Sequence, residues 1–209
     1  MRSLFYHSYN NYMAHAFPYD ELRPLTCDGV DSWGSHAVTL IDSLDMLVVL
    51  GDHAELARGI SLLEESVSFS KDFNVSLFES TIRTVGGLVS AHILATDILN
   101  SSYSGSLLGM AGDLVDRMAV AFNTPTGIPF NTVNLLHGVP KGEVPISCTA
   151  CVTSLVLEFG MLSVLTGNPK YIVRSRCRNS VVPPLTVCVS CCRGLPRTRW
   201  TTSGRGGPA

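Results

Sequence analysis

The chain has 209 residues, of which 45% are hydrophobic and 15% are charged. This composition excludes an intrinsically disordered chain and leaves enough apolar mass for one domain or for part of a larger one. The formal net charge of −2 excludes the strongly basic balance that marks most nucleic-acid-binding proteins.

Apolar residues recur at spacings of three and four along most of the chain, whereas strand-like alternation is rare. The sequence therefore predicts an all-α protein. Helices are expected over residues 2–16, 35–50, 53–68, 77–99, 106–122 and 147–166. Two irregular segments, residues 17–34 and 123–144, lie between them, and long loops on a helical scaffold usually carry function.

The longest apolar runs, residues 39–50 and 148–166, contain the carboxylates Asp42, Asp45 and Glu158. Unpaired carboxylates are costly inside a bilayer, so no transmembrane helix is predicted. The first residues also lack the apolar core of a secretory signal, which predicts either a cytosolic protein or a missing N-terminus. Glycosylation sequons at Asn74 and Asn100 favour a secretory chain.

The last 38 residues differ from the rest of the chain. Residues 172–209 hold seven Arg, no acidic residue and four of the seven cysteines, whereas residues 1–171 hold all seventeen Asp and Glu. We therefore expect one domain, or part of one, over residues 1–171. The tail over residues 172–209 is expected to be unrelated to it, either disordered or an artefact of the gene model.

Several carboxylates stand in apolar surroundings and need partners. Glu79 and Arg83 are four residues apart in a predicted helix, where a surface ion pair is the ordinary interpretation. The glycine pair Gly86-Gly87 follows directly, and glycines inside a helix indicate close backbone packing beside that carboxylate. Asp42 and Asp45 fit either one buried Asp that caps a loop and one exposed Asp, or a polar patch on a glycan cleft.

Cys148 and Cys151 have the spacing of a redox motif. The strand that normally precedes such a motif is not predicted, and zinc would need a second pair such as Cys188 and Cys191. The sequence therefore disfavours both redox and zinc chemistry at this position.

Several motifs occur in one order: residues 20–24 (DELRP), 39–45 (TLIDSLD), 78–83 (FESTIR) with 85–88 (VGGL), and 157–159 (LEF). This ordered set resembles glycoside hydrolase family 47, the α-1,2-mannosidases. Residues 24–29 (PLTCDG) and 124–129 (TPTGIP) look most like the ER degradation-enhancing mannosidase-like branch of that family.

The resemblance implies a fold, a metal and a reaction. The fold is all-α, a partial (α/α) barrel of seven helical hairpins, of which this chain would supply about the first third to half. A calcium ion would lie at the barrel base, and terminal α-1,2-linked mannose would be removed from high-mannose N-glycans with inversion. Such a protein would act on misfolded glycoproteins in the ER lumen, and a thiol-linked oxidoreductase would be a partner, joined through Cys27 or another cysteine.

The resemblance also implies residue roles. Glu79 corresponds to the family's catalytic acid, whose proton is thought to pass through a water, while Arg83 and Glu158 would line the mannose pocket. Scaffold or rim roles are expected for four further acids of the family motifs: Asp20, Glu21, Asp42 and Asp45.

The resemblance ends near residue 171, so the remaining active-site carboxylates and the calcium-binding Thr have no counterpart in this chain. The 209-residue chain alone is therefore expected to be inactive. Two alternatives remain open at this point: a non-catalytic glycan-binding adaptor in the same pathway, and a cytosolic all-α interaction domain.

Overall fold

The structure, a computed structural model, describes residues 1–144 and 148–175. Its α-helices are α1 (Arg2–His15), α2 (Val38–Val49), α3 (His53–Ser66), α4 (Leu77–Glu79), α5 (Gly86–Leu99), α6 (Ser106–Met118), α7 (Thr149–Thr153), α8 (Val156–Thr166) and α9 (Lys170–Ser175). A π-helix, η1 (Ser80–Val85), joins α4 to α5, and 3₁₀ turns follow α5 and α6 at η2 (Asn100–Ser102) and η3 (Ala119–Phe122). The predicted helical fold is thus confirmed over the described residues.

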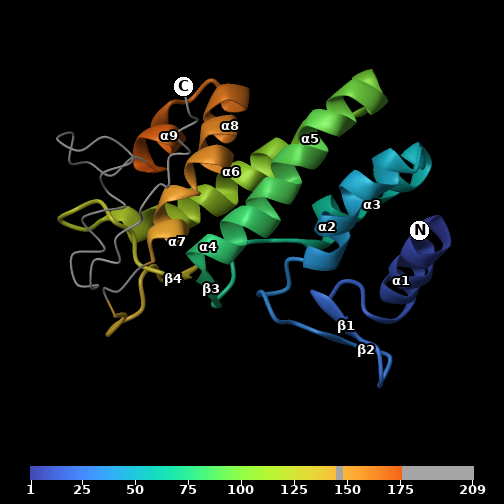
Figure 1. The fold of residues 1–209 in the computed structure, drawn as a ribbon, viewed down its shortest axis with the longest axis horizontal. Helices are drawn as coiled ribbons and strands as arrows, with labels where there is room; N and C mark the ends of the chain where they lie inside the picture. Colours follow the sequence, from blue (N-terminus) through green and yellow to red (C-terminus); the bar gives the residue numbers. More distant parts are fainter. Residues whose placement is uncertain (145–147, 176–209) are drawn as a thin grey trace, which may run out of the picture.

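Two small antiparallel sheets were not predicted. Strand β1 (Glu21–Arg23) pairs with β2 (Asp28–Val30), and β3 (Asn74–Ser76) pairs with β4 (Thr132–Asn134). Each strand has three residues, which is too short for an alternating pattern to be recognised in a sequence. The second sheet ties the long segment 123–144 to the chain just before α4 (Figure 1).

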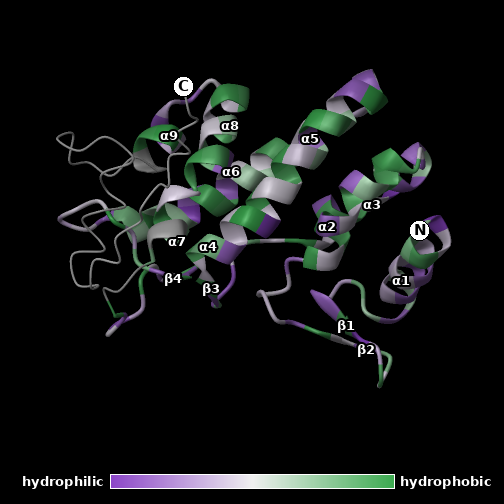
Figure 2. Ribbon diagram, viewed as in Figure 1, coloured by the Kyte–Doolittle hydropathy of each residue, from purple (hydrophilic) through white to green (hydrophobic). Residues whose placement is uncertain are grey.

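Helix α5 lies at the centre of the fold. It packs against α2 and α3 on one side and against α6 and α8 on the other (Figure 1). Hydrophobic residues run along α5, α6 and α8 (Figure 2). Buried side chains of α2, α5 and α8, such as Leu40, Leu88 and Phe159, belong to one core. The helical stretch Leu77–Ser102 is long and apolar enough to cross a membrane, but core helices of soluble proteins pass the same test, and this stretch packs against four helices.

The glycine pair lets neighbouring helices approach α5 closely. A Cβ atom placed on Gly87 would lie 2.6 Å from Cγ2 of Ile41 in α2, and one placed on Gly86 would lie 3.6 Å from Cγ of Glu158 in α8. Close packing is therefore present at Gly87, where Ile41 of α2 lies against α5, whereas a methyl group on Gly86 would make only an ordinary van der Waals contact. The packing was predicted beside the Glu79 carboxylate and is found beside Ile41 instead.

Asp20 anchors the loop that leads into α2. Its side chain is fully buried, and its two carboxylate oxygens accept hydrogen bonds from the backbone N–H groups of Trp33 at 2.7 Å, Ser35 at 2.9 Å and His36 at 2.6 Å. Backbone donors of this kind stabilise a buried carboxylate. This is the scaffold role expected for Asp20.

Three predicted helices differ from the observed ones. The helix expected over residues 35–50 begins only at Val38, because residues 31–37 form the loop that Asp20 holds. The helix expected over residues 77–99 contains the π segment η1. The helix expected over residues 147–166 is divided into α7 and α8 at Ser154 and Leu155, and the side chain of Leu155 is buried in the core there. Residue 147 and the tail from residue 176 onward lie outside the described residues.

We predict that Gly87→Ala destabilises the fold by about 1–3 kcal/mol, because the added methyl group overlaps Ile41. Gly109→Ala is the matched control: this glycine is also helical, and a Cβ placed on it has no atom within 4 Å. The control should be neutral or stabilising by up to about 1 kcal/mol. Urea unfolding measures both, and equal midpoints for the two variants would contradict the proposed contact.

Candidate active site

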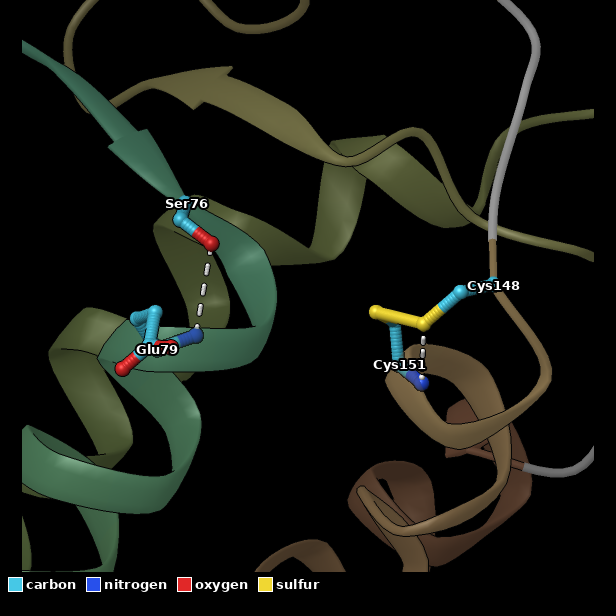
Figure 3. Close-up of a disulfide and its surroundings, with 4 residues drawn as sticks. All are labelled: Ser76, Glu79, Cys148 and Cys151. Atoms are coloured by element: carbon cyan, nitrogen blue, oxygen red, sulfur yellow. Dashed lines mark hydrogen bonds between the residues drawn. A yellow bond between two sulfur atoms is a disulfide. The ribbon is translucent and has the colours of Figure 1, made fainter.

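The first turn of α4 positions Glu79. Ser76 is the N-cap residue of α4, and its side-chain oxygen accepts a hydrogen bond from the backbone N–H of Glu79 at 3.3 Å (Figure 3). Ser76 and Glu79 have the spacing of a capping box, in which a serine and an acid three residues later define a helix start. Glu79 is half-buried, and its carboxylate makes no hydrogen bond or ion pair with the residues that the structure describes.

The π-helix separates Glu79 from Arg83. In η1 the backbone hydrogen bonds run from residue i to i+5, which widens the turn that lies between these two residues. Arg83 pairs with Asp42 of α2 instead: its Nη2 and Nε atoms donate to one carboxylate oxygen at 2.6 and 3.2 Å. The ordinary interpretation of Glu79 and Arg83 as a surface ion pair is therefore wrong.

Trp33 covers the same guanidinium. The Arg83 Cζ atom lies 5.2 Å from the centroid of the Trp33 ring, which is cation–π distance. The backbone of Trp33 is in turn fixed by its hydrogen bond to Asp20. Sequence analysis missed Trp33, because nothing in the spacing of residues 33 and 83 indicates that they meet.

Glu158 approaches from the opposite side of the same helix. It lies on the first turn of α8 next to Gly86, and its Oε2 atom is buried without a hydrogen-bond partner among the described residues. Burial raises the pKa of the Glu158 carboxyl above its usual value. A carboxyl group in this state is suited to accept a hydrogen bond from a ligand hydroxyl or to exchange a proton.

The other acids of the motifs have structural partners. Asp45 accepts a hydrogen bond from Ser90 of α5 at 2.6 Å, and Glu21 accepts one from Ser32 at 2.7 Å. Together with Asp42, these contacts link α2 and the β1–β2 hairpin to their neighbours. They agree with the scaffold and rim roles that were expected.

The expected calcium ion has no ligand set here. The described residues contain no group of three or more His, Cys, Asp or Glu side chains that could hold a metal ion. The residues that surround Glu79 and Arg83 do not fit a calcium site, so no chemical step is assigned to the ion at this position.

The predicted surface sites are accessible. Asn74 and Asn100 are both exposed, the first in β3 and the second in the turn after α5. Cys27 is a free, exposed thiol at the edge of a surface cavity of ≈ 680 Å³ between α1 and the β1–β2 hairpin. Cys188 and Cys191, which a zinc site would have needed, lie outside the described residues.

We predict that Glu158→Gln changes how stability depends on pH. A carboxyl group whose pKa is higher in the folded than in the unfolded state destabilises the fold as pH rises from the unfolded value, near 4.5, through the folded value. The melting temperature of the variant minus that of the wild type should therefore increase as the pH rises through this range. Glu65→Gln makes the same change on the exposed face of α3 and should show no such gain. A constant difference across pH would count against the burial of Glu158.

The chain is similar to known proteins in sequence and in fold. Residues 4–182 match the sequence family described as Glycosyl hydrolase family 47. The chain is 49% identical over 176 residues to ER degradation-enhancing alpha-mannosidase-like protein 2 of Mus musculus and of Homo sapiens, a match that covers 82% of this chain and 30% of each relative. The fold matches the solved alpha-1,2-mannosidase from Trichoderma reesei with a TM-score of 0.76 and 32% identity, over 83% of this chain and 38% of that chain. The chain therefore spans about a third of its relatives' length, and it belongs to glycosyl hydrolase family 47.

Proposed function

We propose that the complete protein hydrolyses terminal α-1,2-linked mannose from high-mannose N-glycans of misfolded glycoproteins, with inversion of configuration. Family membership supports this proposal, as do relatives whose names describe ER degradation-enhancing mannosidase-like proteins. Because the chain spans only 30% of these relatives, it would supply one part of the active site.

One observation carries the assignment to this region of the chain. Arg83 lies in η1, three residues before Gly86, and Glu158 of α8 lies beside Gly86, so segments far apart in sequence bring both residues to the junction of η1 and α5. Glu79 precedes Arg83 on the same continuous helix. Arg83 is fixed by Asp42 and Trp33, so its position does not depend on a ligand. Such preorganisation is what a sugar-binding site needs.

The three residues would have distinct tasks. Glu79 would act as the general acid that protonates the leaving oxygen, through a water molecule. Arg83 would orient carboxylate and hydroxyl groups by its planar donors, and Glu158 would accept hydrogen bonds from sugar hydroxyls. Inversion also needs a base that activates water on the opposite face, about 6.5–9.5 Å from the acid, and we propose that this base comes from a later part of the family domain.

The remaining proposals concern the cellular compartment, the metal ion, a partner protein and the end of the chain. The relatives are consistent with the ER, and we propose the ER lumen as the site of action. Calcium would bind through residues of the complete domain beyond those described. An oxidoreductase linked through an exposed thiol such as Cys27 would be a partner. The tail over residues 172–209 was expected to be unrelated to the domain, but the family match extends to residue 182, so we propose only that residues 183–209 lie outside the catalytic domain.

We predict that Glu79→Gln in the complete protein keeps the fold and lowers mannose release by about 10²–10⁴-fold, because the amide is nearly isosteric but cannot deliver a proton. Free mannose released from a high-mannose glycan measures this loss, and Glu65→Gln on the surface of α3 is the control. Full activity of Glu79→Gln would remove Glu79 from the mechanism. A wild-type protein that binds the glycan but releases no mannose would favour a glycan-binding adaptor instead.

We predict that the protein, when directed into the ER, is glycosylated at Asn74. This residue is exposed in β3, and an attached glycan would extend into solvent. An N-glycan-removing enzyme should shift the mobility of the wild type on a gel, and Asn74→Gln should abolish one such shift. Asn100→Gln tests the second sequon in the same way. Correctly translocated protein with no shift would show that neither sequon is used.

A further inference from the structure

Cys148 and Cys151 form a disulfide at the start of α7. The proposed hydrolysis uses neither sulfur atom. We propose that this disulfide is a reversible redox site, which exchanges with thiolates of low-molecular-weight thiols or protein dithiols. The inference is independent of the proposed function, because it concerns different residues and a different reaction.

The short span of the bridge makes a purely structural role weak. The two cysteines are three positions apart, and their Cα atoms are separated by 5.1 Å. A disulfide stabilises a fold mainly by restricting the unfolded chain, and this effect grows with the length of the closed loop. A bridge between residues three positions apart therefore restricts the unfolded chain less than a long-range bridge would. Val152 and Leu155, both buried, anchor the same segment to the core without it.

The two sulfur atoms differ in access. Cys148 is exposed and precedes α7, whereas Cys151 is half-buried on the helix. An incoming thiolate therefore reaches the Sγ atom of Cys148 first. In Figures 1 and 3 alike, α7 lies next to α4, and the close-up shows the bridge in the neighbourhood of Ser76 and Glu79.

The backbone N–H group of Cys151 stabilises negative charge on the exposed Sγ atom of Cys148. The N–H group of Cys151 donates a hydrogen bond to Sγ of Cys148 at 2.9 Å. A hydrogen bond to sulfur stabilises the thiolate form, which is both the better nucleophile at neutral pH and the better leaving group. The free thiol of Cys27 has instead the carbonyl oxygen of Pro24 as its neighbour, which offers no such donor.

The exchange takes place in two steps, in which atoms and electrons balance. A thiolate attacks Sγ of Cys148, the bond between the two protein sulfurs breaks, and Cys151 leaves as a thiolate that takes up a proton. A second thiolate then attacks the incoming sulfur, and Cys148 leaves as a thiolate stabilised by the Cys151 N–H group. Two thiols are oxidised to one disulfide by two electrons, and the protein disulfide is reduced to two thiols.

The sequence had disfavoured a redox role because no strand precedes these cysteines. That argument concerned one oxidoreductase fold and not the reactivity of the sulfur atoms. The closed bridge, the exposure of Cys148 and the hydrogen bond to its sulfur are features that only the structure supplies.

The test follows thiols in the complete wild-type protein. The protein is equilibrated in buffers of increasing reduced-to-oxidised glutathione ratio, and in a second arm with a reduced protein dithiol of the thioredoxin class. Acid quenching, alkylation and peptide mass spectrometry then give the redox state of the pair. We expect Cys148 and Cys151 to become thiols together and to re-form their disulfide on reoxidation. Reduction only in the second arm identifies a protein as the source of the thiolate, and a bond that resists both arms overturns the proposal.

A variant that keeps Cys148 and lacks Cys151 traps the mixed disulfide, so the rate of its formation can be measured. In Cys151→Ser, Cys148 should form a mixed disulfide with oxidised glutathione at pH 7 at least about threefold faster than Cys27 in the same molecule, because the backbone N–H group of residue 151 stabilises negative charge on its sulfur. In Cys148→Ser, Cys151 should react more slowly than Cys148 does in the first variant, because it is half-buried. A rate at Cys148 equal to that at Cys27 would contradict activation by the backbone donor. The wild-type titration does not depend on the folding of either variant.

Discussion

The contact between Gly87 and Ile41 is the constraint on which the candidate site depends. Because Gly87 has no side chain, the side chain of Ile41 packs directly on the backbone of α5, and polar residues of α2 reach partners on the continuous helix of η1 and α5. Asp42 meets Arg83 and Asp45 meets Ser90 across this interface. A wider separation of the helices would break both contacts at once and leave partly buried charges unpaired, which costs far more than an exposed ion pair contributes.

A second constraint acts from the loop before α2. Asp20 is buried and satisfies three backbone donors, so the loop that carries Trp33 keeps one conformation. The aromatic ring then covers the guanidinium that Asp42 has positioned. Arg83 is thus restrained by a carboxylate in one direction and by a ring in another. The flexible side chain of an arginine normally loses much entropy on binding, and here most of that cost is met during folding.

Much of this arrangement follows from sequence, and the exceptions have physical reasons. The all-α fold was predicted, and so was close packing at the glycine pair, which the structure shows at Gly87. A shared pocket of Arg83 and Glu158 comes from resemblance alone and stays a prediction. The short strands carry too few residues for a pattern, and the partner of Arg83 depends on a helix–helix contact 41 residues away in sequence. The Ser76 cap could have been found, because its spacing to Glu79 is a recognised helix-start signal. The role of Trp33 could not, since long-range contacts leave no local periodicity.

The π segment between Glu79 and Gly86 already holds one residue more than a regular helix would, so this helix has no room for a further insertion. A π turn holds one residue more than an α turn, and each residue of an α-helix corresponds to a rotation of about 100° about its axis. The helix is fixed at both ends, by the Ser76 cap at one and by the Gly87 contact at the other. Loss of a single residue within residues 80–85 would remove the wide turn and leave a regular α-helix whose two ends keep their register. A further insertion would instead rotate one fixed end against the other by about 100°, so insertions should be rarer than substitutions in this segment during evolution.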